Sequence, residues 1–250
     1  MIDDPTFPSN PALALYLSQP HDCSYLPGRQ TRTLFLDPAA QIDQPIYQAL
    51  IDRGYRRSGR FLYQPACPDC SACISLRLPV RDFQPTRSQR RCWKRNAGRF
   101  CITARPPQLE SEQFVLYQKY LAQRHPGSSM DYSNPDQYIE FLHSEWGETR
   151  FYEFRLGDQL AAVVVTDHLP DGLSSVYTFF DPDLQADGIG IFALLWQIEH
   201  ARQLGLKWVY PGFWIRDCRK MRYKSEFRPL EAWSGQGWVR FAPGEPLLAD

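Results

Sequence analysis

Hydrophobic residues recur at two different spacings along the chain, and each spacing predicts one kind of element. Apolar residues repeat every three or four positions in 44–53, in 109–124 and from Pro135 onward, which indicates helices with one buried face. Asn134 and Gly54 stand where a helix start and a helix end favour them. In 189–204 the first two turns are apolar on nearly every side, so this helix is expected to lie buried against a sheet.

Other segments alternate or run apolar over short stretches, which predicts strands. Short strands are expected at 33–36 and 61–63, and a longer one in ISLRLPVRDF. Three runs, FYEFRL, QLAAVVVTDHL and LSSVYTFFD, are separated by Gly157-Asp158 and Asp171-Gly172, which are typical of tight hairpin turns. They predict an antiparallel meander. The buried helix then leads to a strand, LKWVYP, that should run parallel to the last meander strand through a right-handed crossover.

The length of the chain and one proline pair predict two domains. A length of 250 residues suits two modest domains, and Pro106-Pro107 breaks any regular element. We therefore expect an α+β protein in which 1–105 form a smaller, basic N-terminal α+β domain behind a proline-rich arm. Residues 106–250 should form a mixed sheet flanked by helices, with a short basic helix opened by Asp217 after its last crossover.

Composition indicates a soluble globular protein, because 43% of the residues are hydrophobic and 14% are aromatic. The first ten residues, MIDDPTFPSN, lack the basic and apolar segments of a secretory signal. No run approaches the roughly 18 apolar residues that a membrane helix needs. A cytoplasmic protein with no membrane partner is therefore expected.

The net charge of zero argues against a general polyanion binder, but the charge is unevenly distributed. The first hundred residues carry 14 basic and 8 acidic residues, a net charge of +6, and eight basic residues lie between Arg77 and Arg99. Such clusters attract phosphates, although a solvated surface would look the same. Trp93, inside this run, is compatible with base stacking or with anchoring a helix into the core.

A second group of arginines comprises Arg53, Arg56, Arg57 and Arg60, which lie within eight residues between a predicted helix and a predicted strand. Guanidinium groups on a short turn can converge on one anion, either a carboxylate or a phosphate. They could equally pair with acids of the other domain.

Seven cysteines without a signal segment predict reduced thiols rather than a disulfide framework. Cys67, Cys70 and Cys73 form CPDCSAC, a spacing that suits zinc or an iron–sulfur cluster, and Cys23 or Cys92 could add a fourth ligand. A second C-x-x-C pair is missing, however, and free cysteines are often simply buried. No cofactor is therefore expected, and these three cysteines are the candidates if a metal is bound.

The order of elements in the second half is a helix pair, a meander, a crossover helix and a parallel strand, and it resembles the GNAT acyltransferase fold. In that fold the two parallel strands splay apart and the acyl donor lies in the gap. The segment 185–190 also resembles the Q-x-x-G-x-G turn that holds the pyrophosphate of coenzyme A, because a helix N-terminus favours an anion. Asp187 within it would repel a pyrophosphate.

Segments in order along the chain give a narrower match: GYRRSG, YQPACPDCSAC, SQRR, YLAQRHPGSSM, SSVYTFFDP and CRKMRYKSEFRP. They resemble the aminoacyl-tRNA-protein transferase family over roughly residues 23–230. The resemblance to its bacterial members implies transfer of leucine from leucyl-tRNA to the N-terminal Asp or Glu of a protein, which marks that protein for degradation by the N-end rule. The family does not use acyl-CoA, and its eukaryotic members transfer arginine.

Aminolysis of an activated ester needs positioning, deprotonation of the amine and stabilisation of an oxyanion, but no covalent enzyme intermediate. For the acidic side chain of the acceptor, the expected contacts are Arg56, Arg57 and Arg77. For the amine and the ester, the candidates are Tyr177, Asp181 and Tyr223. For the tRNA acceptor end, the expected contacts are Arg90, Arg91, Lys94, Arg219, Lys220, Arg222 and Lys224.

Each of these side chains could instead pack in the core or cap a turn. Two other functions stay open from the residues alone, namely an acyl-CoA N-acyltransferase with a basic accessory domain, and an RNA- or metal-binding module without enzymatic activity. The choice between leucine and arginine depends on the shape of a pocket that the sequence does not reveal.

Overall fold

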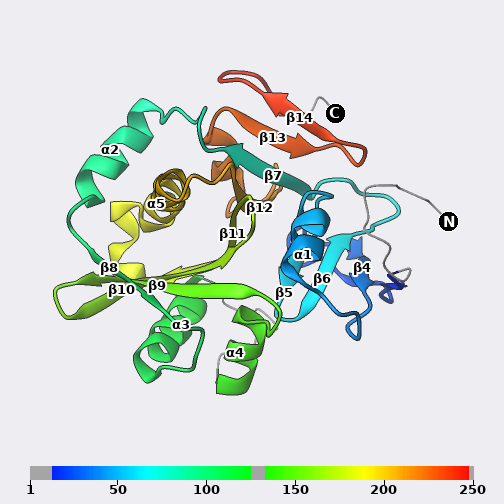
Figure 1. Cartoon of the computed structure of the whole chain (residues 1–250), viewed down its shortest axis with the longest axis horizontal. Coiled ribbons are helices and arrows are strands. Elements are labelled where there is room, and N and C mark those ends of the chain that lie inside the picture. Colours follow the sequence, from blue (N-terminus) through cyan, green and yellow to red (C-terminus); the bar gives the residue numbers. More distant parts are fainter. Residues whose placement is uncertain (1–12, 125–132, 248–250) are drawn as a thin grey trace.

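One large mixed sheet organises the chain, and helices cover both of its faces (Figure 1). The computed structural model describes residues 13–124 and 133–247. The strand order of this sheet is β14-β13-β7-β12-β11-β10-β9-β8. Its strands are β7 (Ile74–Pro79), β8 (Cys101–Arg105), β9 (Glu148–Leu156), β10 (Gln159–His168), β11 (Gly172–Phe180), β12 (Trp208–Trp214), β13 (Leu230–Trp233) and β14 (Trp238–Phe241).

Two pairs of helices sandwich this sheet. On one face lie α3 (Ser111–Arg124) and α4 (Pro135–Leu142), and on the other lie α2 (Arg87–Asn96) and α5 (Ile189–Gln203) (Figure 1). The central strand β10 is buried from Leu160 to Asp167, because both of its faces are covered. Asn134 caps α4 as predicted, since its side chain accepts hydrogen bonds from the two N–H groups of residues 136 and 137.

The predicted meander and crossover are confirmed. Strands β9, β10 and β11 pair antiparallel in sequence order, and α5 then leads back to β12, which pairs parallel to β11. A 3₁₀ helix, η1 (Pro182–Asp187), joins β11 to α5. This is the order of elements that the GNAT resemblance predicts, so the α+β fold class is confirmed.

A smaller unit packs against the edge of this body. It contains the four-stranded sheet β1-β4-β6-β5, made of β1 (Leu15–Leu17), β4 (Thr33–Leu36), β6 (Phe61–Pro65) and β5 (Arg56–Ser58). The hairpin of β2 (His21–Asp22) and β3 (Gln30–Thr31) and the helix α1 (Gln44–Ile51) complete it. Tyr47 of α1 and Leu62 of β6 share a hydrophobic cluster with Tyr210 of β12, so the two units are packed as one body.

The boundary predicted at residue 105 does not coincide with the division between the two sheets, because β7 and β8 are strands of the large sheet and α2 packs on α5. The basic helix expected from Asp217 is instead a turn followed by a short 3₁₀ helix, η2 (Arg222–Glu226).

Some predictions lie outside the described residues, including most of the proline-rich arm and the part of the YLAQRHPGSSM segment beyond Arg124. Within the described residues, no helix is long and apolar enough to cross a membrane.

Candidate functional site

The two parallel strands part after a short contact, and this opening is the centre of the candidate site. Strands β11 and β12 pair only over 172–174 and 208–210. Beyond that point β12 continues along β7, with a register shift before Gly212, while β11 continues along β10. Gly212 has a φ of 91°, a conformation that favours glycine because a side chain would be strained there. The backbone of β12 therefore turns away from β11.

Two buried cations lie beside this glycine. Arg56 of β5 is 6% exposed and Lys224 of η2 is 9% exposed. A methyl group placed on Gly212 would approach Lys224 Nζ to 3.3 Å and Arg56 Nη2 to 3.4 Å, so the two charges are close neighbours. Arg56 Nη2 donates a hydrogen bond to the carbonyl oxygen of Tyr210 (2.8 Å), and Lys224 Nζ donates one to that of Phe213 (3.0 Å).

Neither cation has an ion pair with a carboxylate within the described residues. Burial and, to a smaller extent, the repulsion of Arg56 lower the pKa of Lys224 to about 7, while the Cys218 thiol acts in the opposite direction. Burial also lowers the pKa of Arg56, against the opposing influence of Tyr47 and Tyr63. Burying unpaired charge costs free energy, so an anionic ligand between these groups would be strongly favoured.

Two phenols lie on elements that flank the opening, Tyr177 on β11 and Tyr223 on η2. The hydroxyl of Tyr177 on β11 is buried and has no hydrogen-bond partner, and its ring packs against Phe141 (5.1 Å between centroids) and Tyr120 (6.3 Å). Tyr223, next to Lys224, is half-buried; burial and then the nearby Tyr120 raise its pKa to about 12. Both phenols are therefore neutral hydrogen-bond donors at ordinary pH, and the unpaired hydroxyl of Tyr177 is available to a ligand.

Arg57, the neighbour of Arg56, is committed to the fold. Its Nε and Nη2 donate to the two carboxylate oxygens of Asp167 at 2.5 and 2.6 Å, and Nη2 also donates to the carbonyl oxygen of Leu142 (3.0 Å). Asp167 is fully buried and also accepts from the hydroxyls of Tyr47 and Thr149. Arg57 thus forms the alternative interaction, an ion pair between the two units, and its direct contact with an acceptor stays a prediction.

Arg77 is also engaged within the chain. Its guanidinium lies between the rings of Trp208 and Trp238, 3.8 and 4.5 Å from their centroids, and pairs with Glu231 (2.6 Å) and Asp52 (3.3 Å). These contacts join β7 to β13 and to the end of α1, and they already pair the Arg77 charge with two carboxylates.

Asp181 caps η1 rather than facing the opening. Its side chain accepts from the N–H of Asp183 and from Gln159, and pairs with Lys119 at 2.6 Å. Burial alone would raise the pKa of Asp181, but these donors lower it below its usual value. The catalytic role predicted for Asp181 is not supported by this geometry, and a turn cap accounts for the residue.

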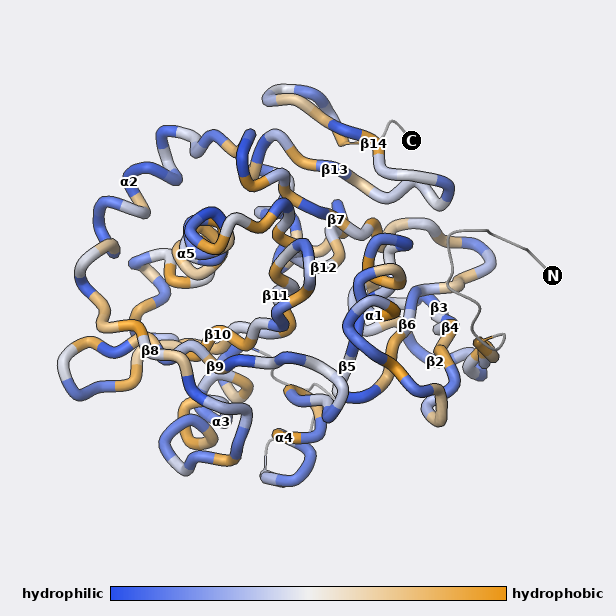
Figure 2. Tube along the Cα trace, in the orientation of Figure 1, coloured by the Kyte–Doolittle hydropathy of each residue, from blue (hydrophilic) through white to orange (hydrophobic). Residues whose placement is uncertain are grey.

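The basic surface predicted for tRNA is present with one exception. The side chains of α2 that face solvent include Arg90, Arg91 and Lys94, and the helix is largely hydrophilic (Figure 2). Trp93 on its other side packs against Phe192 of α5, which is the anchoring alternative. Three basic residues of the turn before η2 and of η2 itself are exposed, namely Arg219, Lys220 and Arg222. Lys224 is the exception, because it is buried beside Arg56 and cannot contact phosphates at the surface.

Helix α2 covers the turn that resembles a coenzyme A site. Asn96 Nδ2 donates to the carbonyl oxygen of Asp187 (2.9 Å), and a methyl group on Gly188 would approach Cys92 Sγ to 3.3 Å. Arg99 pairs with the carboxylate of Asp187 at 2.7 Å. Protein groups thus pack against this turn, and the Asp187 carboxylate remains beside it, so the geometry disfavours a pyrophosphate there.

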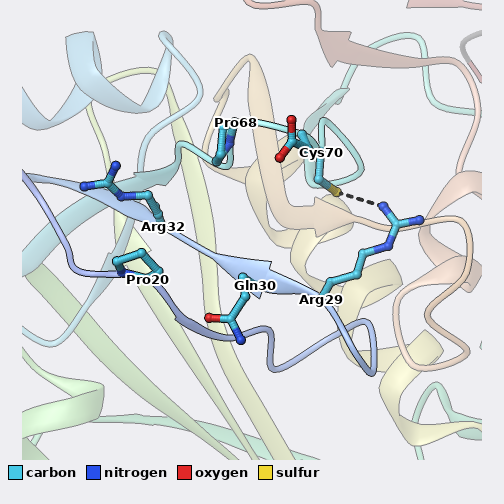
Figure 3. Close-up of a pocket in the computed structure, with 7 residues that line it drawn as sticks. Pro20, Arg29, Gln30, Arg32, Pro68 and Cys70 are labelled. Carbon is cyan, nitrogen blue, oxygen red and sulfur yellow. Dashed lines mark hydrogen bonds between the residues drawn. The ribbon is translucent and has the colours of Figure 1, made fainter.

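The cysteine segment lies between β6 and β7. Cys67 Sγ is 3.2 Å from the Thr31 hydroxyl. Burial, and to a smaller extent the nearby thiols of Cys23 and Cys67, raise the pKa of the Cys73 thiol to about 12. Arg29 donates to Cys70 Sγ at 3.5 Å across a cavity of about 500 Å³ that Arg32 also lines (Figure 3). In residues 13–124 and 133–247, no group of three His, Cys, Asp or Glu side chains is arranged to hold a metal ion.

Sequence reasoning missed the meeting of Arg56 and Lys224. One signal was available, because Pro211-Gly212 at the end of the predicted strand LKWVYP marks a bulge or a close approach of backbone. The partner of that glycine could not be read from the chain, since residues 56 and 224 meet only when β5 and η2 converge on β12.

A sheet that parts between two adjacent parallel strands, after a meander and a crossover helix, is compatible with a GNAT-like acyltransferase. The chain belongs to the arginine-tRNA-protein transferase family. The family's C-terminal model matches residues 112–234, and its N-terminal model matches residues 21–91.

Curated relatives cover nearly the whole chain. An aspartate/glutamate leucyltransferase of Pseudomonas aeruginosa (strain LESB58) is 48% identical over 91% of this chain and 96% of that protein. One of Pseudomonas savastanoi pv. phaseolicola is 49% identical with the same coverage. Among solved structures, the C-terminal domain of a putative lysylphosphatidylglycerol synthetase from Agrobacterium fabrum is 13% identical with a TM-score of 0.44. That match covers 70% of this chain and 53% of that chain.

Proposed function

We propose that this protein transfers leucine from leucyl-tRNA to the N-terminal Asp or Glu of acceptor proteins and forms a peptide bond. The observation that supports this proposal most directly concerns Arg56. Its guanidinium is buried at the opening between β11 and β12 and has no carboxylate partner in the described chain. The carboxylate of an acceptor would supply the missing anion. The names of the relatives, which are 48–49% identical over most of the chain, support the same reaction.

In this reaction the neutral α-amine of the acceptor attacks the ester carbon of leucyl-tRNA. The carbon–oxygen bond to the terminal ribose breaks. The proton lost by the amine ends on the ribose oxygen, which leaves as a hydroxyl group. Negative charge develops on the former carbonyl oxygen, and Tyr177 donates to it, a role supported by its buried hydroxyl having no hydrogen-bond partner. Tyr223 is the second phenol available at the site. Arg56 holds the acceptor's side chain and so brings its amine to the ester.

The donor enters from the basic surface. The exposed side chains of α2 and of 219–222 offer donors for the phosphates of the tRNA acceptor end. Leucine is favoured over arginine as the donated residue, because a guanidinium would add a third positive charge beside Arg56 and Lys224. Aromatic rings such as Phe141 instead offer an apolar surface to a leucyl side chain. In the cytoplasm, the added leucine marks the acceptor for degradation by the N-end rule.

The donor is tested by offering a peptide that begins with Asp one of three donors: leucyl-tRNA, arginyl-tRNA or acetyl-CoA. We expect a mass gain of one leucine residue with leucyl-tRNA alone, and abolition of the gain when the tRNA is digested with RNase beforehand. Acetylation from acetyl-CoA, or transfer of arginine at a comparable rate, would refute the proposal.

A further inference from the structure

Lys224 is set apart from the other basic residues of its segment. Arg219, Lys220 and Arg222 are exposed, whereas Lys224 reaches inward to the carbonyl oxygen of Phe213 and to Met221 Sδ, 3.4 Å from Nζ. A buried lysine usually has a carboxylate partner, because an isolated ammonium loses its hydration on burial. In the described chain no carboxylate pairs with Lys224, and a second cation, Arg56, lies beside the same glycine, Gly212.

The cost of this arrangement points to a ligand. Burial and Arg56 both disfavour the ammonium form of Lys224, and among the groups that face it only the Cys218 thiol acts in the opposite direction. Replacing the lysine by an apolar residue would remove this cost, so packing alone does not account for it. A carboxylate held between the two cations would offset this cost. Arg56 keeps donors beyond its bond to the Tyr210 carbonyl, and Lys224 keeps one beyond its bonds to the Phe213 carbonyl and Met221 Sδ.

We propose that Lys224 is a specificity-determining residue that, together with Arg56, forms a two-cation cradle for the acidic side chain of the acceptor's first residue. This inference rests on the proposed function and refines it. Gly212 lets both cations approach the β12 backbone, because any side chain there would contact both. An uncharged first residue would leave both cations buried and unpaired, so neutral residues such as Asn and Gln are excluded although they have the same size.

The cradle has a consequence for pH. Lys224 can be neutral in the empty site and must be an ammonium when it pairs with a carboxylate, so binding of the acidic group takes up a proton above pH 7. Affinity for the acidic group should therefore be greatest below pH 7 and fall as the pH rises, by up to tenfold per pH unit. Arg56 stays charged over this range and contributes no such dependence.

The test uses a peptide whose N-terminal residue is replaced by a succinyl group, which keeps the carboxylate of Asp but has no amine to titrate. Its inhibition constant is measured between pH 6 and 9 against leucine transfer to an Asp peptide. For the unaltered protein we expect the constant to rise at least tenfold between pH 7 and 9. For Lys224→Met we expect at least tenfold weaker inhibition at pH 6 and no change with pH.

Two controls accompany the test. Lys207→Met alters an exposed lysine that pairs with Asp171, and it should keep the pH dependence of the unaltered protein. Thermal unfolding should show Lys224→Met to be at least as stable as the unaltered protein, because a buried charge has been removed.

A flat inhibition profile in the unaltered protein, which requires no variant, would overturn the cradle. So would a Lys224→Met protein that keeps its preference for Asp over Asn peptides. Absence of leucine transfer by the unaltered protein would instead refute the proposed function, so the two failures are distinguishable.

Discussion

Replacing Arg57 with methionine should test stability rather than acceptor binding. Both carboxylate oxygens of Asp167 accept from Arg57, and the carboxylate is fully buried. Removing the guanidinium leaves that carboxylate with only the Tyr47 and Thr149 hydroxyls, and a buried ion that loses its partner costs about 3–5 kcal/mol. Native proteins are stable by only about 5–15 kcal/mol, so a large part of the stability would be lost.

Urea unfolding monitored by tryptophan fluorescence measures this loss. Arg60→Met is the matched control, because Arg60 is exposed in the turn between β5 and β6, three residues after Arg57, and should change stability by less than about 0.5 kcal/mol. The double variant Arg57→Met/Asp167→Leu removes both charges and should recover much of the stability. A folded Arg57→Met protein that loses less than about 1 kcal/mol but no longer transfers leucine would show that Arg57 is an acceptor ligand after all.

The Arg57–Asp167 pair also makes the stability of the fold decrease at acidic pH. Burial alone would raise the pKa of Asp167, but Arg57 and the hydroxyl donors hold it below its usual value. A carboxyl whose pKa is lower in the folded chain stabilises the fold above its unfolded pKa of about 3.9, and this contribution is lost as the pH falls through the folded pKa. The double variant lacks this carboxyl, so its stability should fall less than that of the unaltered protein below about pH 4.

Three further variants separate the roles of the remaining residues. Reversing the charges of Arg90, Arg91 and Lys94 to Glu should weaken tRNA binding and reduce the salt slope by about 1 per lost phosphate contact; an unchanged slope would remove α2 from the tRNA site. Tyr177→Phe should lower kcat about 10²–10³-fold without loss of stability, since its hydroxyl has no protein partner, and an unchanged kcat would contradict its role. Asp181→Ala should cost about 1 kcal/mol as a lost cap and leave kcat unchanged, and a large fall in kcat in folded protein would restore its catalytic assignment.

The second half of the fold could be predicted because its elements follow one another closely. Tight turns at Gly157 and Gly172 define the meander, and a buried helix between two strands allows essentially one crossover. The boundary predicted at residue 105 does not coincide with the division between the sheets because β7 inserts between β12 and β13, a pairing between distant segments that no local pattern specifies.

The candidate site was only partly predictable for the same reason. The pattern of arginines marked Arg56 and Arg57 equally, but their side chains point to opposite faces of β5 as successive residues of a strand do. One therefore meets Asp167 and the other meets Lys224. Lys224 was grouped with the surface cations because its neighbours in sequence are exposed, and only the packing of η2 on β12 distinguishes it.

Recognition of an acidic N-terminus by a buried, unpaired cationic pair is the central claim. Its most direct test is a competition in one tube, in which equal amounts of peptides beginning with Asp, Glu, Asn and Gln compete for leucyl-tRNA and the products are separated by mass. We expect leucine on the Asp and Glu peptides, and at least a hundredfold less on the Asn and Gln peptides. Comparable labelling of all four peptides would contradict the claim.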